Sequence, residues 1–252
     1  MPNLLIELLS EEIPARMQRK ASSDLEKLFT EGISELGLTY ESSANFSTPR
    51  RLTLVLENVS SKSLSRVEEK RGPRKDAPEK AVQGFLKSVG LELSQLEIRQ
   101  EKKGEFYFAS IRTEGRKAAD IVSTVLDKTV RNFPWPKSMR WGEGSLKWVR
   151  PLHSIICILY DEDGSKVVNI DIEGISSGDK TFGHRFMGNG GFSVNSFEDY
   201  ASKLKKEFVI LDPLERAEII LQEIGNQAFA QGLELINDPS LLNEVVGLIE
   251  WP

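Results

Sequence analysis

Three runs of eight residues, each largely apolar, constrain the fold of this chain most strongly. They are 3-NLLIELLS-10, 52-LTLVLENV-59 and 153-HSIICILY-160. Short runs rich in Leu, Ile and Val are typical of strands that are covered on both faces. A helix that crosses a bilayer needs roughly 20 apolar residues, so none of these runs is long enough to span a membrane. We therefore expect three buried strands in a chain of 252 residues that can bury a real core.

Amphipathic helices are predicted between and after these runs. Residues 15–37 carry apolar side chains at helical spacing, and Pro14 and Gly37 suit the start and the end of that helix. Its expected buried side consists of Leu25, Leu28, Phe29, Ile33 and Leu36. A further helix is expected after Pro78. The other predicted helices span 117–132, 196–208, 213–232 and 239–251.

Two more strand signals complete the pattern. Residues 95–100 and 105–112 predict a hairpin around Gly104, with Lys102 and Lys103 in its turn. Residues 166–175 predict a strand that follows the turn 161-DEDG-164. Strands and helices alternate without a regular βαβ period, so the predicted fold class is α+β. We expect an α+β region at 1–195 and a helical segment at 196–252.

The N-terminus and the cysteine usage indicate the cellular compartment. The first residues carry Glu7 and lack the basic segment of a secretory signal. The single cysteine, Cys157, lies inside an apolar run and cannot form an internal disulfide. We expect it to act as a small buried hydrophobe. These features predict a cytoplasmic location.

Charge is distributed unevenly along this acidic chain. The formal net charge is -5, yet residues 62–75 and 131–150 are locally basic. In the second stretch, cations surround two tryptophans: Lys137, Arg140, Lys147 and Arg150 lie close to Trp141 and Trp148. Such cations can bind phosphates even when the whole protein is acidic. Indoles beside them either stack on bases or anchor a core.

Most of the familiar catalytic signatures are absent from the sequence. It has no GxxxxGK[ST] loop and no GxGxxG after a strand, and its only histidines are His153 and His184. The sequence has no CxxC pattern and so lacks the usual ligands of a zinc site. The acids at 161–164 and 169–173 are better explained as a solvated turn and a polar strand face. We therefore expect no catalytic residue and no metal site.

Seven stretches, taken in order, resemble the N-terminal part of the β subunit of bacterial heterotetrameric glycyl-tRNA synthetase. They are 4-LLIELLSEEIPA-15, 48-TPRRL-52, 70-KRGP-73, 137-KSMRW-141, 149-VRPLH-153, 183-GHRFMG-188 and 244-EVVGLIEWP-252. In that family the α chain makes glycyl-adenylate with ATP and Mg²⁺, and the longer β chain contributes tRNA binding. The resemblance implies a ligase subunit without cofactor or activity of its own, in a tetramer of two α and two β chains. Its other partner would be tRNA(Gly), with no membrane involved, and the family chain continues into further helical domains.

Ten residues in these stretches become candidates for tRNA contact through the resemblance. They are Arg50, Arg51, Arg71, Lys137, Arg140, Trp141, Arg150, His153, His184 and Arg185. The resemblance does not separate tRNA contacts from contacts with the α chain or from residues that hold the fold. Arg140 and Arg150 in particular can form a basic surface, or can be buried and pin the loop around Gly142 and Gly144.

Two other functions stay open. This part of the family is similar to the editing-type domain of phenylalanyl-tRNA synthetase, which suggests a hydrolase, and a purely structural interface is the third reading. Editing is needed where binding alone cannot reject a smaller or isosteric competitor. Glycine is the smallest amino acid, which weighs against that reading.

Overall fold

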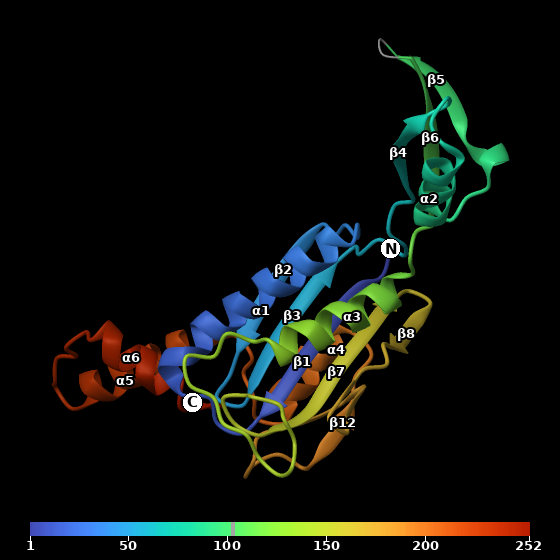
Figure 1. Ribbon diagram of the computed structural model, residues 1–252. Coiled ribbons are helices and arrows are strands. Elements are labelled where there is room, and N and C mark those ends of the chain that lie inside the picture. Colours follow the sequence, from blue (N-terminus) through green and yellow to red (C-terminus); the bar gives the residue numbers. More distant parts are fainter. Residues whose placement is uncertain (102–103) are drawn as a thin grey trace. The chain divides into compact units, whose positions relative to one another are not determined.

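The computed structural model describes residues 1–101 and 104–252, which form two compact units (Figure 1). Unit 1 contains residues 1–61 and 117–252, and unit 2 contains residues 62–116. The predicted α+β class is confirmed, because helices and mixed sheets share the chain. The boundary expected at residue 196 falls inside unit 1. None of the helices in the described ranges has the length and apolar character that a membrane crossing requires.

The main sheet of unit 1 is built on the three apolar runs. Its strand order is β2 (Ser42–Ser47), β3 (Arg51–Glu57), β1 (Asn3–Ser10), β7 (Leu152–Asp161), β10 (Ile175–Gly178) and β9 (Asp171–Ile172), and β8 (Gly164–Val167) pairs with β7. Strand β1 is central and antiparallel to both β3 and β7, so Ile6 pairs with Leu54 on one side and Cys157 on the other. The predicted buried strands are confirmed. Cys157 is fully buried, and burial raises the pKa of its thiol.

Helices cover both faces of this sheet. Helices α1 (Ala15–Glu35) and α3 (Ala118–Arg131) lie side by side on one face, and α4 (Phe197–Lys206) covers the other (Figure 1). Successive side chains of β1 point to opposite faces, so Ile6 belongs to the same buried cluster as Phe29 of α1, while Leu5 belongs to a second cluster with Tyr200 of α4. This two-sided burial explains why the strands are continuously apolar.

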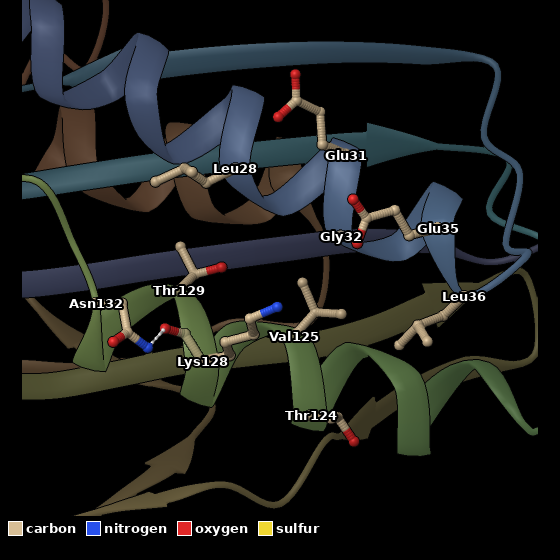
Figure 2. A pocket seen from close by; sticks show the side chains of 10 residues that line it. All are labelled: Leu28, Glu31, Gly32, Glu35, Leu36, Thr124, Val125, Lys128, Thr129 and Asn132. Carbon is tan, nitrogen blue, oxygen red and sulfur yellow. Dashed lines mark hydrogen bonds between the residues drawn. The ribbon is translucent and has the colours of Figure 1, made fainter.

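Two residues of the predicted α1 side are not in the core. Leu28 and Leu36 are 36% and 38% exposed, whereas Leu25, Phe29 and Ile33 are buried. Leu28 and Leu36 line a groove of about 340 Å³ between α1 and α3. In Figure 2, Val125 of α3 faces them across it. The helical periodicity was therefore right, but the sheet and α3 bury only part of the expected stripe.

The strand predicted at 166–175 is wrong as a single element, because the chain forms β8, β9 and β10 there. A tight turn separates β9 from β10: Glu173 and Gly174 both adopt left-handed φ values, of 55° and 86°. The carboxylate of Asp171 accepts a hydrogen bond from the Gly174 N–H at 2.9 Å and closes this turn. A strand cannot pass through two left-handed residues without reversing.

The C-terminal part of unit 1 is helical, as predicted. After the β11 (Lys180–Phe182) and β12 (Gly191–Ser193) hairpin come α4, α5 (Pro213–Ala230) and α6 (Pro239–Val246). Side-chain oxygens of Ser196, Asp212 and Asp238 cap the helix N-termini. Helix α6 was predicted to reach residue 251 but ends at Val246.

Unit 2 is a small antiparallel sheet with one helix. The strand order is β4 (Arg66–Arg74), β6 (Gly104–Thr113), β5 (Glu97–Glu101), and the helix is α2 (Glu79–Val89), followed by the short turn η1 (Leu93–Gln95). The predicted hairpin is confirmed by the β5–β6 pairing, although its turn residues Lys102 and Lys103 lie outside the described residues. Helix α2 packs closely on the sheet, since a Cβ added at Gly72 would lie 2.5 Å from the Phe85 ring.

Candidate functional site

Several of the family-like stretches meet at one end of the unit 1 sheet. Where β1 ends, the Ser10 N–H donates to the Arg50 carbonyl at 2.7 Å, and the Ile13 N–H donates to the Pro49 carbonyl at 2.6 Å. The Glu11 N–H donates to the Pro151 carbonyl at 3.0 Å. These bonds join the stretches 4–15, 48–52 and 149–153, which are far apart in the sequence. We call this end of the sheet the motif end.

A buried ionic centre lies beneath the surface of the motif end. Arg51 is fully buried, with its Nε 3.3 Å from Glu7 Oε2 and its Nη1 2.8 Å from Glu250 Oε1. Its Nη2 donates to the Phe182 carbonyl at 2.9 Å. The guanidinium of Arg51 thus ties β1, β3 and the C-terminal segment together and is turned away from solvent. Its predicted tRNA contact is untested, and its burial favours a structural role.

Hydrogen bonds complete the ionic centre around Glu7. Thr181 and Tyr200 each donate to the Glu7 carboxylate at 2.5 Å, and the hydroxyls of Thr53 and Tyr200 lie 2.9 Å apart. Burial raises the pKa of Glu7, and the charge of Arg51 opposes that rise. Burial by itself lowers the pKa of Arg51, because it disfavours the charged form. The charges of Glu250 and Glu7 outweigh this effect and raise the pKa above its ordinary value. No local sequence pattern predicts this centre, because its members come from distant segments.

A second buried arginine fixes the helical segment to the sheet. Arg216 of α5 is fully buried and donates to the carbonyls of Ile210 at 2.6 Å, Leu211 at 3.1 Å and Ser47 at 3.0 Å. Burial lowers the pKa of Arg216 to about 10. Because carbonyl oxygens satisfy its donors, this arginine holds the fold.

The surface of the motif end carries a mixed group of charges. His153 Nε2 lies 2.8 Å from Glu11 Oε1, and Arg185 Nη1 lies 3.1 Å from Glu11 Oε2 and 2.9 Å from Glu12 Oε1. The hydrogen bond from His153 lowers the pKa of Glu11. His184 contributes differently, since its Nδ1 accepts from the backbone N–H groups of the two residues that follow Arg185. The half-buried Arg50 lies at the same end, and its charge also lowers the pKa of Glu11.

The tryptophans of the basic stretch face inward. Trp148 is fully buried, and its ring centroid lies 4.9 Å from that of Phe133 and 5.0 Å from that of Trp135. Trp141 is partly buried against the main core. Two backbone hydrogen bonds between Met139 and Trp148, of 2.8 and 3.2 Å, close the segment into a loop. We call residues 137–150 the cationic loop; its indoles act as core anchors.

A carboxylate from the β9–β10 turn pins the cationic loop. Glu173 accepts hydrogen bonds from the Ser145 hydroxyl at 2.5 Å and from the N–H groups of Ser145 and Leu146, both at 3.0 Å. The bond from the Ser145 hydroxyl, with those from the backbone, lowers the pKa of Glu173. Gly144 lies so close that an added Cβ would clash with Glu173 Oε2. The pin is therefore an acid that sequence reasoning missed.

The cations of the cationic loop face outward. Lys137, Arg140, Lys147 and Arg150 are all exposed, and none forms an ion pair with a described residue. The only described hydrogen bond from their charged groups runs from Arg150 Nη1 to the Val149 carbonyl, at 3.1 Å. The alternative in which Arg140 and Arg150 are buried and pin the loop is wrong, because both side chains lie at the surface.

Arg71, the candidate in unit 2, is exposed but paired. Its guanidinium lies 2.8 Å from Glu101 and 4.0 Å from the centre of the Phe106 ring. Unit 2 as a whole carries 13 Lys and Arg against 9 Asp and Glu, which leaves 20 basic and 29 acidic side chains in unit 1. The excess of negative charge therefore belongs to unit 1, which also carries the cationic loop.

Within residues 1–101 and 104–252, no group of three or more His, Cys, Asp or Glu side chains is arranged to hold a metal ion. The expectation that this chain has no catalytic residue stays a prediction. The arrangement at the motif end is one of fixed loops, buried anchors and surface charges.

Comparison with known proteins assigns the chain to a family of aminoacyl-tRNA synthetase subunits. The family described as glycyl-tRNA synthetase beta subunit matches residues 4–252. The glycine–tRNA ligase beta subunit of Paracoccus denitrificans is 58% identical over 252 residues, and that of Ruegeria sp. is 57% identical over the same length. The chain belongs to the glycyl-tRNA synthetase beta subunit family, so the resemblance seen in the sequence is confirmed. All of this chain is covered, but it spans only 37% of the length of those two relatives.

Proposed function

We propose that this chain is part of the β chain of a cytoplasmic glycine–tRNA ligase, where it supports tRNA binding and assembly with the α chain. In this proposal the α chain activates glycine with ATP and Mg²⁺, in a tetramer of two α and two β chains. Membership of the family supports the ligase assignment. The observation that carries the tRNA role is the cationic loop, which presents four exposed cations without a carboxylate partner in the described residues.

The physics of phosphate binding favours this loop over the other candidates. A cation that already pairs with a carboxylate must give up that partner before it binds a phosphate, as Arg71 and Arg185 would. His153 would likewise have to leave the Glu11 carboxylate. Lys137 and Arg140 have no such partner in the described residues. The loop backbone is also fixed by Trp148 and Glu173, so little conformational entropy is lost when the RNA binds.

The acidic remainder of unit 1 adds specificity. Negative charge elsewhere repels the phosphate backbone and confines favourable contact to the loop. The indoles contribute indirectly, because Trp148 anchors the loop from inside the fold. We therefore assign phosphate contact to Lys137, Arg140, Lys147 and Arg150, and structural roles to Arg51 and Trp148.

The test uses the complete ligase with Arg140→Ala and Arg150→Ala, singly and together. Each lost phosphate contact should lower the slope of log affinity against log salt by about 0.7–0.9, with weaker tRNA binding overall. Melting temperature and ATP–pyrophosphate exchange with glycine should not change, since both side chains are exposed and lie outside the α chain.

Lys166→Ala provides the matched control, because Lys166 is an exposed cation of β8 that forms no ion pair in the described part of the chain. Unchanged tRNA affinity in the stable double variant would overturn the proposal for this loop. Deacylation of mischarged tRNA by the ligase, lost in the same variants, would instead support the editing function.

A further inference from the structure

The neck of the cationic loop brings two of its cations together. Met139 and Trp148 form an isolated antiparallel bridge, with backbone hydrogen bonds of 2.8 and 3.2 Å that run in both directions. Arg140 directly follows this bridge and Lys147 directly precedes it, so the two cations leave opposite strands of the neck at the same level. Successive side chains of an extended segment point in opposite directions, and the Trp148 side chain is buried, which directs Lys147 outward. Both cations are exposed.

This placement is unfavourable until an anion binds. Like charges that lie opposite each other across an antiparallel pair repel one another. Neither Arg140 nor Lys147 forms an ion pair with a carboxylate among the described residues, so nothing in that part of the chain relieves the repulsion. An anion bound between the two side chains would relieve it.

The acids in and against the cationic loop do not take this role. Four cations and one acid, Glu143, leave the loop with a net charge of +3. Glu173, which pins the loop, already accepts hydrogen bonds from the Ser145 hydroxyl and the Leu146 N–H, and it lies 3.9 Å from Arg131 Nη1. The positive charge at the neck is therefore available to a partner.

The aromatic side chains of this region are not placed for stacking on bases. Trp148 and Trp135 pack with Phe133 in a ring cluster, and Trp141 is partly buried against the main core. The turn at 142–145 contains no aromatic residue. Proteins bind unpaired RNA largely by stacking its bases on aromatic side chains. The cationic loop therefore offers contacts to the sugar–phosphate backbone and few to unpaired bases.

The rigidity of the loop also favours paired RNA. An A-form helix is recognised mostly by its shape, through its phosphates and 2′-hydroxyl groups, which the helix holds at fixed positions. The loop is fixed at its neck by the bridge between Met139 and Trp148 and near its turn by Glu173. Two fixed surfaces associate with little loss of conformational entropy.

We propose that Arg140 and Lys147 together bind one stretch of sugar–phosphate backbone in a double-helical segment of the tRNA, independently of its base sequence. This inference rests on the tRNA role proposed above for the cationic loop and names the part of the RNA that the loop binds. The two cations act as a pair, because a phosphate between them offsets both charges at once.

Phosphate-ethylation interference with the complete ligase and tRNA(Gly) tests the proposal. Ethylation of a contacted phosphate should block binding to the wild-type ligase, but it should have no further effect on a variant with both Arg140→Gln and Lys147→Gln. The phosphates that differ in this way should be neighbours and should lie in paired nucleotides. If they lie in unpaired nucleotides, the proposal is overturned.

Changes in the tRNA sharpen this test. Inverting the base pairs of the mapped segment keeps the helix and should leave the affinity unchanged, because backbone contacts carry no sequence information. Opening the same segment with mismatches should weaken binding to the wild-type ligase several-fold and should not weaken binding to the double variant further. An affinity that follows the identity of the bases would contradict the proposal.

The variants also separate this inference from the proposed function. Arg140→Gln and Lys147→Gln should each weaken tRNA binding several-fold at an unchanged melting temperature, and Arg140→Lys should keep most of the affinity because it keeps the charge. Lys166→Gln is the matched control and should bind as the wild type does. If the two Gln variants bind tRNA normally, the tRNA role of the loop is wrong and the inference fails with it. If they bind weakly but map to unpaired nucleotides, only the inference fails.

Discussion

The arginine of the buried ionic centre and the arginines of the cationic loop come from similar short basic motifs but occupy opposite environments. Arg51, in 48-TPRRL-52, is fully buried between Glu7 and Glu250. Arg140, in 137-KSMRW-141, is exposed and has no carboxylate partner among the described residues. The difference arises from distant acids, since an arginine enters a core only where carboxylates and carbonyls satisfy its charge and its donors. A motif that resembles an RNA contact in sequence can therefore be a structural element.

The largest effect is expected at the buried arginine. Arg51→Met should lower the free energy of unfolding by about 3–5 kcal/mol, because it leaves two glutamates buried without their counter-charge. Arg140→Met should change it by less than about 0.5 kcal/mol, as is usual at the surface. Urea unfolding of both variants measures the contrast.

A triple variant separates loss of charge balance from loss of shape. If Glu7→Gln and Glu250→Gln are added to Arg51→Met, much of the lost stability should return, since no unpaired charge is left in the core. Equal unfolding midpoints for Arg51→Met and Arg140→Met would show that the two arginines do not differ as the structure indicates.

A smaller effect is expected within the ionic centre at Tyr200. Tyr200→Phe removes one hydrogen-bond donor from the Glu7 carboxylate and one partner from Thr53, and should lower the free energy of unfolding by about 1–3 kcal/mol. The control is Tyr40→Phe, at a partly buried tyrosine for which no hydrogen bond from the hydroxyl is described. A loss of the same size at Tyr40 would mean that the ring, and not the bond to Glu7, determines the effect.

Sequence reasoning succeeded where a short segment determines its own structure. The run 3–10 and helix 15–37 were predicted because continuous apolarity and helical spacing are local signals. Strand β2, 42-SSANFS-47, was missed because it is a largely polar edge strand. The splitting of 166–175 was missed because a left-handed turn at Glu173 does not follow from residue type.

The candidate site was less predictable because its contacts are long-range. The outward position of Lys137 and Arg140 agrees with their charge, which is a local property. The burial of Arg51 depends on Glu250, 199 residues away, and no spacing rule connects them. The pin on the cationic loop depends in the same way on Glu173, 28 residues from Ser145. A single sequence therefore identifies candidate cations, but it does not show which of them are buried in structural ion pairs.

The smallest effect is expected at the surface of the motif end, where the charges are paired but solvated. The hydrogen bond from His153 lowers the pKa of Glu11 below its ordinary value of 4.5. A carboxyl group whose pKa is lower in the folded state contributes stability above the unfolded pKa, and that stability is lost as the pH falls through the folded pKa. The wild-type protein should therefore lose slightly more stability than Glu11→Gln when the pH falls below 4.5. For an exposed pair the difference should be on the order of 0.5 kcal/mol. Thermal unfolding at several pH values measures this difference in stability, with Glu218→Gln on α5 as the control. Parallel pH profiles for the wild type and Glu11→Gln would show that the His153 contact contributes nothing to the stability of the folded state.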